Sequence, residues 1–303
     1  MSATRDYLRL HFIVLLWGFT AILGALITVP SVEIVFYRTL FAFIGLGILL
    51  KLRKRTLRLP REAVLPILGT GALIAAHWIL FFAAARVANV SVCLAGMATC
   101  SLWTSFIEPV FNKKKIRIFE VMLGLLALAG LWVIFQFDFQ YKWGIIMAVL
   151  SAFLSALFTV LNGKFTRNHN AYSITFYEMI GAWVSIVLFL PFYARYFTAD
   201  GMIHLDATNM DWIYLLILAL ICTVFAYSES VELMKRLSAF IVNLTVNLEP
   251  VYGIIMALIL FPEKEKMPGN FYLGTSLILV SVLLYPLFNR YYRRRQLKVD
   301  NLR

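Results

Sequence analysis

A carboxyl group and three neutral polar side chains interrupt the apolar segment 237–261. They are Asn243, Thr245, Asn247 and Glu249. Counted from Ser238, Glu249 lies ~16 Å along a helix at ~1.5 Å per residue, near the centre of a ~30 Å hydrocarbon core. A carboxyl group at that depth is costly unless it faces protein or a water-filled cavity, and Pro250, which follows it, leaves the carbonyl of Val246 without its intrahelical donor. We therefore expect Glu249 on a polar path through a membrane protein, the alternative being a kinked structural helix whose acid pairs with another helix.

The two asparagines of this segment point away from the acid. Asn243 and Asn247 are four residues apart and share a helix face, whereas Glu249 lies ~200° from Asn247 at ~100° per residue. A straight helix cannot turn both faces to one path, so either a kink at Pro250 rotates them or one face joins helices. We expect Glu249 on the path and leave both roles open for the asparagines.

A base and an acid occupy matching positions early in two other apolar segments. Arg38 is the only basic residue inside such a segment, and Glu178 stands at the related position 140 residues later. We expect them on opposite sides of the midplane, ~12 Å apart along the normal. In one interpretation Arg38 binds a substrate carboxylate and Glu178 binds a proton or a cation. In the other, each side chain extends to its nearer membrane surface.

A histidine and several tryptophans are further candidates. His77 could titrate near neutral pH, although a hydrogen bond between helices is the simpler interpretation. Trp17 could line a cavity for an amphipathic substrate together with three other tryptophans, or all four could serve packing. The other three are Trp78, Trp103 and Trp183.

Two acids lie one turn apart near the end of another apolar segment. Glu232 precedes Lys235 by three residues and Arg236 by four, a spacing that favours ion pairs within a helix. Glu229 either pairs in a similar way or joins the polar path.

The elements that must position these residues are membrane-spanning helices. The chain has 303 residues, 61% of them apolar, whereas a soluble domain is ~45–50% apolar. Windows of ~20 apolar residues predict an all-α polytopic membrane protein with ten transmembrane helices. The predicted spans are 10–28, 32–50, 64–85, 90–110, 118–136, 143–161, 172–193, 212–234, 238–261 and 271–288.

The basic residues predict the orientation. If the chain starts in the cytoplasm, 22 of its 28 Lys and Arg residues fall in cytoplasmic segments and five in external ones. The positive-inside rule then places both termini in the cytoplasm, and 289–303 becomes a basic cytoplasmic tail. The net charge of +12 therefore needs no nucleic-acid partner, and the run 51–58 is a topology signal that can contact anionic lipids.

Short matches recur in the same order in both halves. FYR at 36–38 matches FYE at 176–178, and Leu-Gly at 123–124 matches Leu-Gly at 273–274. They predict two five-helix repeats, 10–136 and 143–288. Because five is odd, the second repeat enters the membrane from the opposite side, which gives the inverted architecture of many secondary transporters, with a site near the midplane.

Three motifs carry a family resemblance over roughly 10–288. They are LLWGFTAI (15–22), FYR (36–38) and NLEPVYGIIMALILFPE (247–263). With them the chain resembles the EamA family of the drug/metabolite transporter superfamily, which implies ten helices, two EamA repeats and the movement of small metabolites, often outward. The first half departs from the pattern, because Trp103 stands where the repeat offset would place a counterpart of Pro250, and this leaves that half's part in a shared site open.

These observations predict a secondary transporter in the cell inner membrane. The resemblance implies export of small organic metabolites such as amino acids or related amphipathic compounds, by alternating access. We expect a small-molecule substrate and the lipid bilayer as partners, no nucleic acid, no cofactor and no metal. The chain has no HExxH, Walker lysine or GxSxG motif, so an enzyme is not expected. An uncoupled channel or facilitator is the alternative, and an intramembrane enzyme a more distant one.

Overall fold

The protein is an all-helical bundle over the residues that its structure describes. The computed structural model describes residues 3–54, 57–113, 115–136, 141–261, 263 and 268–300, and no strand occurs among them. Nine helices or interrupted helices in this part of the chain are long and apolar enough to cross a membrane, and α6 adds a shorter apolar stretch, Ile118–Gly130. The predicted fold class is confirmed.

Each predicted span coincides with one helix or one interrupted helix. The first five are α1 (Ala3–Leu26), α2 (Ser31–Leu52), α3 (Arg61–Val87), α4 (Val90–Met97) with α5 (Cys100–Asn112), and α6 (Ile118–Gln136). The second five are α7 (Lys142–Phe165), α8 (Ala171–Phe197), α9 (Asn209–Leu216) with η2 (Ile217–Phe225) and α10 (Ala226–Leu233), α11 (Ala239–Val246) with α12 (Glu249–Leu260), and α13 (Gly269–Asp300). The last helix continues through most of the predicted basic tail.

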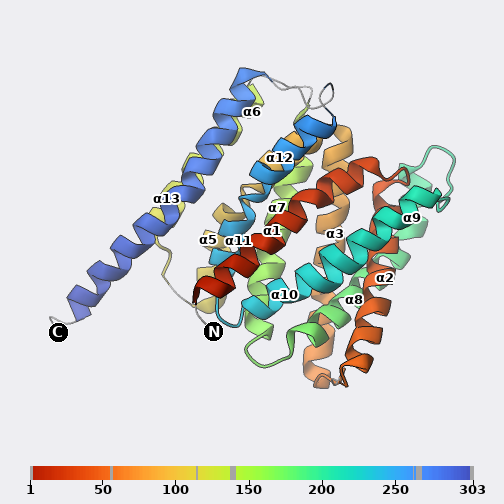
Figure 1. Ribbon diagram of the computed structural model, residues 1–303, viewed down its shortest axis with the longest axis horizontal. Coiled ribbons are helices and arrows are strands. Elements are labelled where there is room, and N and C mark those ends of the chain that lie inside the picture. The colour runs from red at the N-terminus through yellow and green to blue at the C-terminus, as the bar shows by residue number, and fades with distance from the viewer. Residues whose placement is uncertain are drawn as a thin grey trace.

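The start of α1 and the end of α13 lie at the same end of the bundle, which we call the proximal end, and the opposite end is the distal end (Figure 1). From the proximal end α1 runs toward the distal end, whereas α7, its counterpart in the second half, runs the other way (Figure 1). Opposite directions of corresponding helices are what an inverted repeat requires.

The fourth span of each half is interrupted at the same relative place. The first breaks at Ala98 and Thr99, between α4 and α5, and the second at Asn247 and Leu248, between α11 and α12. A side chain caps the start of each pair: Asn89 Oδ1 accepts from the Val92 N–H at 2.8 Å, and Ser238 Oγ accepts from Ile241 N–H at 3.2 Å. The first half thus has a break at this place without a counterpart of Pro250.

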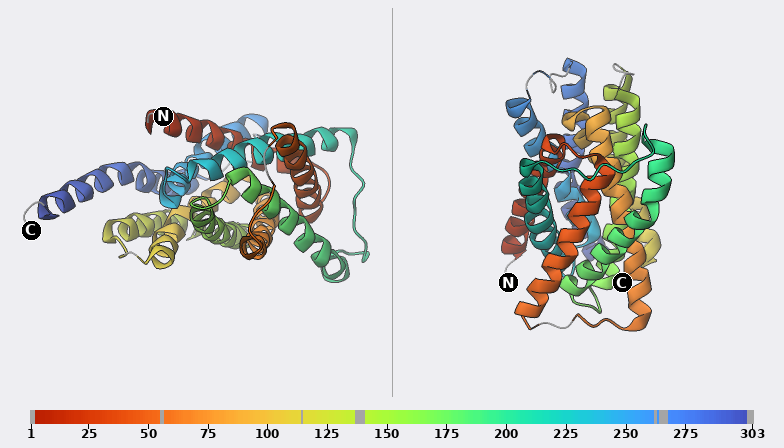
Figure 2. Two further views of the ribbon diagram at one scale, coloured as in Figure 1. Left: turned by 90° about the horizontal axis from the view of Figure 1, so that it is seen from below. Right: turned by 90° about the vertical axis from the view of Figure 1, so that its right-hand side faces the viewer.

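The two interrupted helices pack against each other, α4 on α12 and α5 on α11. Around them, α7 covers α4 and α5 while α1 covers α12, and α3 packs on α7 and α8. The pair α6 and α13 lies together at one edge of the bundle (Figures 1 and 2). This arrangement surrounds the helix breaks with protein, so polar groups there are shielded from lipid.

Candidate functional site

A cavity lies among the helices of both halves, beside the break between α11 and α12. It leaves about 60 Å³ for the centres of water-sized molecules, and one ordered water needs ~10–15 Å³ of such space. The cavity therefore has room for several waters or one small organic molecule. The first half lines it with Trp17, Thr20, Arg38, His77, Trp78, Phe81 and Met97. The second half adds Ser155, Phe158, Thr159, Tyr227, Ser230, Met234, Val242, Asn243, Val246 and Glu249.

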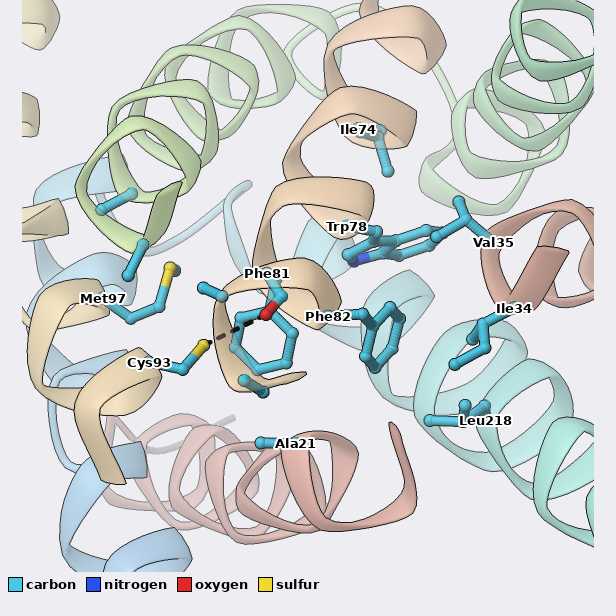
Figure 3. Packing of buried hydrophobic residues seen from close by; sticks show 14 of the residues in the cluster. Ala21, Ile34, Val35, Ile74, Trp78, Phe81, Phe82, Cys93, Met97 and Leu218 are labelled. Atoms are coloured by element: carbon cyan, nitrogen blue, oxygen red, sulfur yellow. Dashed lines mark hydrogen bonds between the residues drawn. The ribbon is translucent and has the colours of Figure 1, made fainter. Parts of the chain in front are cut away.

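Arg38 of α2 supplies the positive charge of this cavity. Its side chain is 2% exposed, its Nε donates to Thr223 Oγ1 at 2.9 Å, and its guanidinium carbon lies 3.7 Å from the centre of the Trp78 ring. Figure 3 shows Trp78 and Phe82 of α3 in the packed core beside α2. Arg38 thus does not extend to a membrane surface. Its two terminal nitrogens have no hydrogen-bonding partner among the described residues, which leaves a planar fork for an anion.

A π-helix places the partner of Arg38. In η2 the Ala226 N–H bonds the carbonyl of Ile221, five residues back, so the carbonyl of Cys222 is available to accept from the indole of Trp17 at 3.1 Å. In the same turn Thr223 Oγ1 donates to the carbonyl of Leu218 at 2.9 Å and thereby turns its oxygen to Arg38. Short π-helical segments are frequent at functional sites.

Glu249 supplies the negative charge. It is the first residue of α12, so its carboxyl group lies at the end of the helix whose dipole favours an anion. Among the described residues it has no hydrogen-bonding partner and no ion pair within 4 Å, and it lines the same cavity as Arg38. Pro250 follows inside the first turn of α12, where its missing N–H is tolerated.

His77 and Asn243 line the cavity and also join helices. His77 Nδ1 lies 2.7 Å from Ser151 Oγ on α7, and Asn243 Nδ2 donates to Thr104 Oγ1 on α5 at 2.8 Å. The helix break allows Asn243 and Glu249 to face one cavity, because α11 and α12 are no longer in helical register.

Three predicted site residues do not line the cavity. Asn247 donates from Nδ2 to Ser101 Oγ at 2.6 Å and joins α11 to α5. Glu229 accepts from the Tyr172 hydroxyl and lies 3.9 Å from Arg9, so it holds α1, α8 and α10 together at the proximal end. Glu178 is fully buried behind the cavity wall and accepts from the Tyr227 hydroxyl at 3.2 Å. The rotation of each helix about its axis, which sequence spacing does not fix, determines that these three side chains point away from the cavity.

The ion pairs near the proximal end are partly those expected. Glu232 pairs with Lys235 at 2.8 Å. The predicted ion pair between Glu232 and Arg236 is wrong. Arg236 instead donates from Nε and a terminal nitrogen to the two oxygens of Asp6, at 2.7 and 2.9 Å. This two-pronged bond, which connects the segment after α10 to α1, raises the pKa of Arg236 above its ordinary value.

Of the four tryptophans, Trp17 and Trp78 line the cavity, whereas Trp103 and Trp183 do not. Several lining residues were not predicted for the site, among them Tyr227 and Met234. Ser155 and Thr159 could have been found, because hydroxyl residues recur every four positions along α7 from Ser151 onward.

Known proteins resemble this chain along most of its length. The EamA-like transporter family matches residues 7–136 and again residues 142–286. A Bacillus subtilis (strain 168) protein described as "Uncharacterized transporter YxxF" is 25% identical over 235 residues, which cover 75% of this chain and 72% of that protein. A solved structure described as "Crystal structure of protein" has a similar fold, with a TM-score of 0.69 and 16% identity over 95% of this chain and all of that one. The chain therefore belongs to the EamA-like transporter family of the drug/metabolite transporter superfamily and is a multi-pass membrane transporter.

Proposed function

We propose that this protein is a secondary transporter that exports amino acids and related small amphipathic metabolites across the cell inner membrane by alternating access. The observation that carries the proposal is the pair Arg38 and Glu249, two opposite charges that face one cavity without neutralising each other directly. A zwitterion presents one carboxylate and one ammonium group, so it can bind both charges at once.

The walls of the cavity suit an apolar substituent. Trp17, Trp78, Phe81 and Phe158 contribute aromatic surface around the two charges. A ligand with an apolar side chain and a charged head gains from burial of that side chain, while the few charged groups fix its orientation. The cavity therefore favours amphipathic amino acids over purely polar solutes.

The route into the cavity favours loading from the proximal end. Met234 lines the central cavity and also a second pocket at that end, which Arg167, Lys235 and Ser238 help to form. With the proximal end in the cytoplasm, as the basic residues predict, a substrate enters from the cytoplasm and leaves outward. In the alternating step the two halves would exchange their arrangements around the fixed charges.

Three ligands that differ in one group test the charge assignment. L-leucine carries both groups, 4-methylpentanoate lacks the ammonium group and isopentylamine lacks the carboxylate. We expect Glu249→Gln to weaken L-leucine binding by about 10- to 100-fold, because a bond to a charged group contributes ~1.5–3 kcal/mol, and to leave 4-methylpentanoate binding nearly unchanged. Arg38→Met should weaken L-leucine and spare isopentylamine.

Binding is measured by ligand-induced thermal shift, and efflux is measured in proteoliposomes. Glu232→Gln, at the ion pair with Lys235, serves as the control that should behave like wild type. Equal losses for all three ligands in Glu249→Gln would mean that the acid supports the fold rather than binds an ammonium group. Binding of none of the three by the wild-type protein would refute the proposed substrate class.

A further inference from the structure

A buried acid behind the cavity wall has fewer donors than its oxygens require. Glu178 of α8 is fully buried, and only its Oε2 receives a hydrogen bond, from the Tyr227 hydroxyl at 3.2 Å. Its Oε1 has no hydrogen-bonding partner among the described residues. No cation of the described chain lies within ion-pair distance of this carboxyl group, and an uncompensated carboxylate in such a place is costly.

The neighbouring amide, that of Asn162, also has an oxygen without a described donor. Asn162 of α7 donates from Nδ2 to the Tyr227 hydroxyl at 2.8 Å, and its Oδ1 also has no donor within the described part of the chain. The two side chains share the Tyr227 hydroxyl as a hydrogen-bonding partner. One proton on Glu178 Oε1 would add the donor that this group of buried oxygens lacks among the described residues.

The elements around Glu178 leave the cavity side as its route of access. On one side α3 lies so close that a Cβ on Gly71 would come within 2.2 Å of the Glu178 carbonyl oxygen. On the other side stand Asn162 of α7 and Tyr227 of α10, and Tyr227 also lines the central cavity. Tyr227 therefore connects Glu178 to the central cavity.

On α2, Glu33 stands in the first turn and accepts from the His204 N–H at 3.4 Å. Further ionisable groups on the surrounding helices also have partners of their own. From α10, Tyr227 contacts Glu178 directly, while Glu229 bonds Tyr172 of α8. From α3, His77 is held by Ser151, and from α2, Arg38 is held by Thr223. Titration at this place accordingly belongs to Glu178 and its bond to Tyr227.

We propose that Glu178 is the proton-binding site that couples transport to the proton gradient, separate from the substrate cavity and connected to it through Tyr227. The inference rests on the proposed transport function and adds the second transported species. Glu178 takes up one proton from the side on which protons are abundant and releases it on the other side. No bond other than this O–H forms or breaks, and the proton gradient supplies the energy.

Glutamine at position 178 tests this assignment, because its carbonyl can accept from Tyr227 while its amide cannot take up a proton. In proteoliposomes with radiolabelled L-leucine, we expect Glu178→Gln to keep exchange of internal for external L-leucine. Accumulation driven by a pH gradient should fall at least tenfold, and release of protons into weakly buffered solution on L-leucine binding should disappear. Glu33→Gln is the matched control, since Glu33 is also buried with an oxygen that lacks a described partner, and it should retain gradient-driven accumulation.

Tyr227→Phe gives a second, independent measurement. It removes the donor to the carboxylate form of Glu178, so the pH at which gradient-driven transport is half-maximal should rise. Gradient-driven accumulation of wild-type size in Glu178→Gln, an unmoved pH midpoint in Tyr227→Phe, or wild-type transport that ignores the gradient would each overturn the proton site while leaving the transporter proposal intact. A wild-type protein that moves no L-leucine would refute the transporter proposal and the proton site with it.

Discussion

Arg38 shows how one side chain can keep a charge inside a membrane bundle. The ring of Trp78 covers one face of its guanidinium group, and Thr223 fixes its Nε. A cation over an aromatic ring gains ~2 kcal/mol or more when it is desolvated. These two contacts orient the group while its terminal nitrogens stay available for a ligand.

Thr223 is therefore expected to act as a positioning residue. Thr223→Val keeps the shape of the side chain and removes the oxygen, so the guanidinium fork loses its fixed direction. We expect weaker L-leucine binding by about 10-fold or more, in line with ~1.5–3 kcal/mol for a bond to a charged group, and little change for isopentylamine. Ligand-induced thermal shifts measure both.

Thr223→Ser retains the hydroxyl and should bind L-leucine like wild type. If the valine and serine variants lose the same affinity, the methyl group of Thr223 matters through packing and the hydrogen bond to Arg38 does not position the fork.

Sequence reasoning finds the charges at this scale but not their partners. Arg38 and Glu249 stand out because a charge deep in an apolar segment is costly unless protein or water receives it. Thr223 and Tyr227 carry no such signal, and their positions depend on the π-helical turn and on helix rotation. The same rotations take Glu178, Glu229 and Asn247 out of the cavity wall.

Among the elements, the two interrupted helices arise from different local chemistry. In α11–α12 the polar residues and Pro250 indicate the helix break from the sequence. In α4–α5 the break follows Gly96, whose carbonyl accepts from both the N–H and the hydroxyl of Thr99 at 3.2 and 2.8 Å. A Cβ on Gly96 would come within 2.5 Å of the Ala148 Cβ, so close packing on α7 also contributes, and such tertiary contacts are invisible in one sequence.

The crossing of α3 and α8 depends on two glycines, each of which faces the backbone of the opposite helix. A Cβ on Gly71 would lie 2.2 Å from the Glu178 carbonyl oxygen, and one on Gly181 would lie 2.1 Å from that of Leu68. We expect Gly71→Ala and Gly181→Ala each to lower thermal stability in detergent, because overpacking costs ~1–3 kcal/mol and backbone atoms cannot move aside singly. Small residues commonly allow such close approach of membrane helices.

Gly69 provides the control on the same helix, since a Cβ there meets nothing within 4 Å. Gly69→Ala should leave stability unchanged or raise it, because alanine favours a helix by ~1 kcal/mol over glycine. Equal losses at Gly69 and Gly71 would mean that helix flexibility, rather than the close crossing, explains the effect.

For the whole molecule, the order of the ten spans and the inverted halves follow from the sequence, because apolar length and an odd number of spans per repeat are strong constraints. The shape of the cavity does not follow, since it depends on how α4–α5 and α11–α12 cross. Sidedness also remains a prediction, based on the distribution of basic residues.

Thiol labelling can test that sidedness, because the three native cysteines, Cys93, Cys100 and Cys222, are buried. Asn168 is exposed in the proximal connector between α7 and α8, and Met202 is 61% exposed at the distal end. In intact cells we expect a membrane-impermeant maleimide to label Met202→Cys and to spare Asn168→Cys until the cells are opened. The reverse labelling pattern would mean that the proximal end lies outside the cell, and the proposed direction of transport would then be reversed.

The π-helix of η2 stores one surplus residue in the wall of the transport path. If the segment Ile217–Phe225 tightened to an ordinary α-helix, everything after it would turn by ~100° relative to α9. Such a turn would carry Tyr227 and Ser230 around the helix axis and withdraw Thr223 from Arg38. One change of winding would then alter the cavity lining, the grip on the guanidinium group and the contact to Glu178 together.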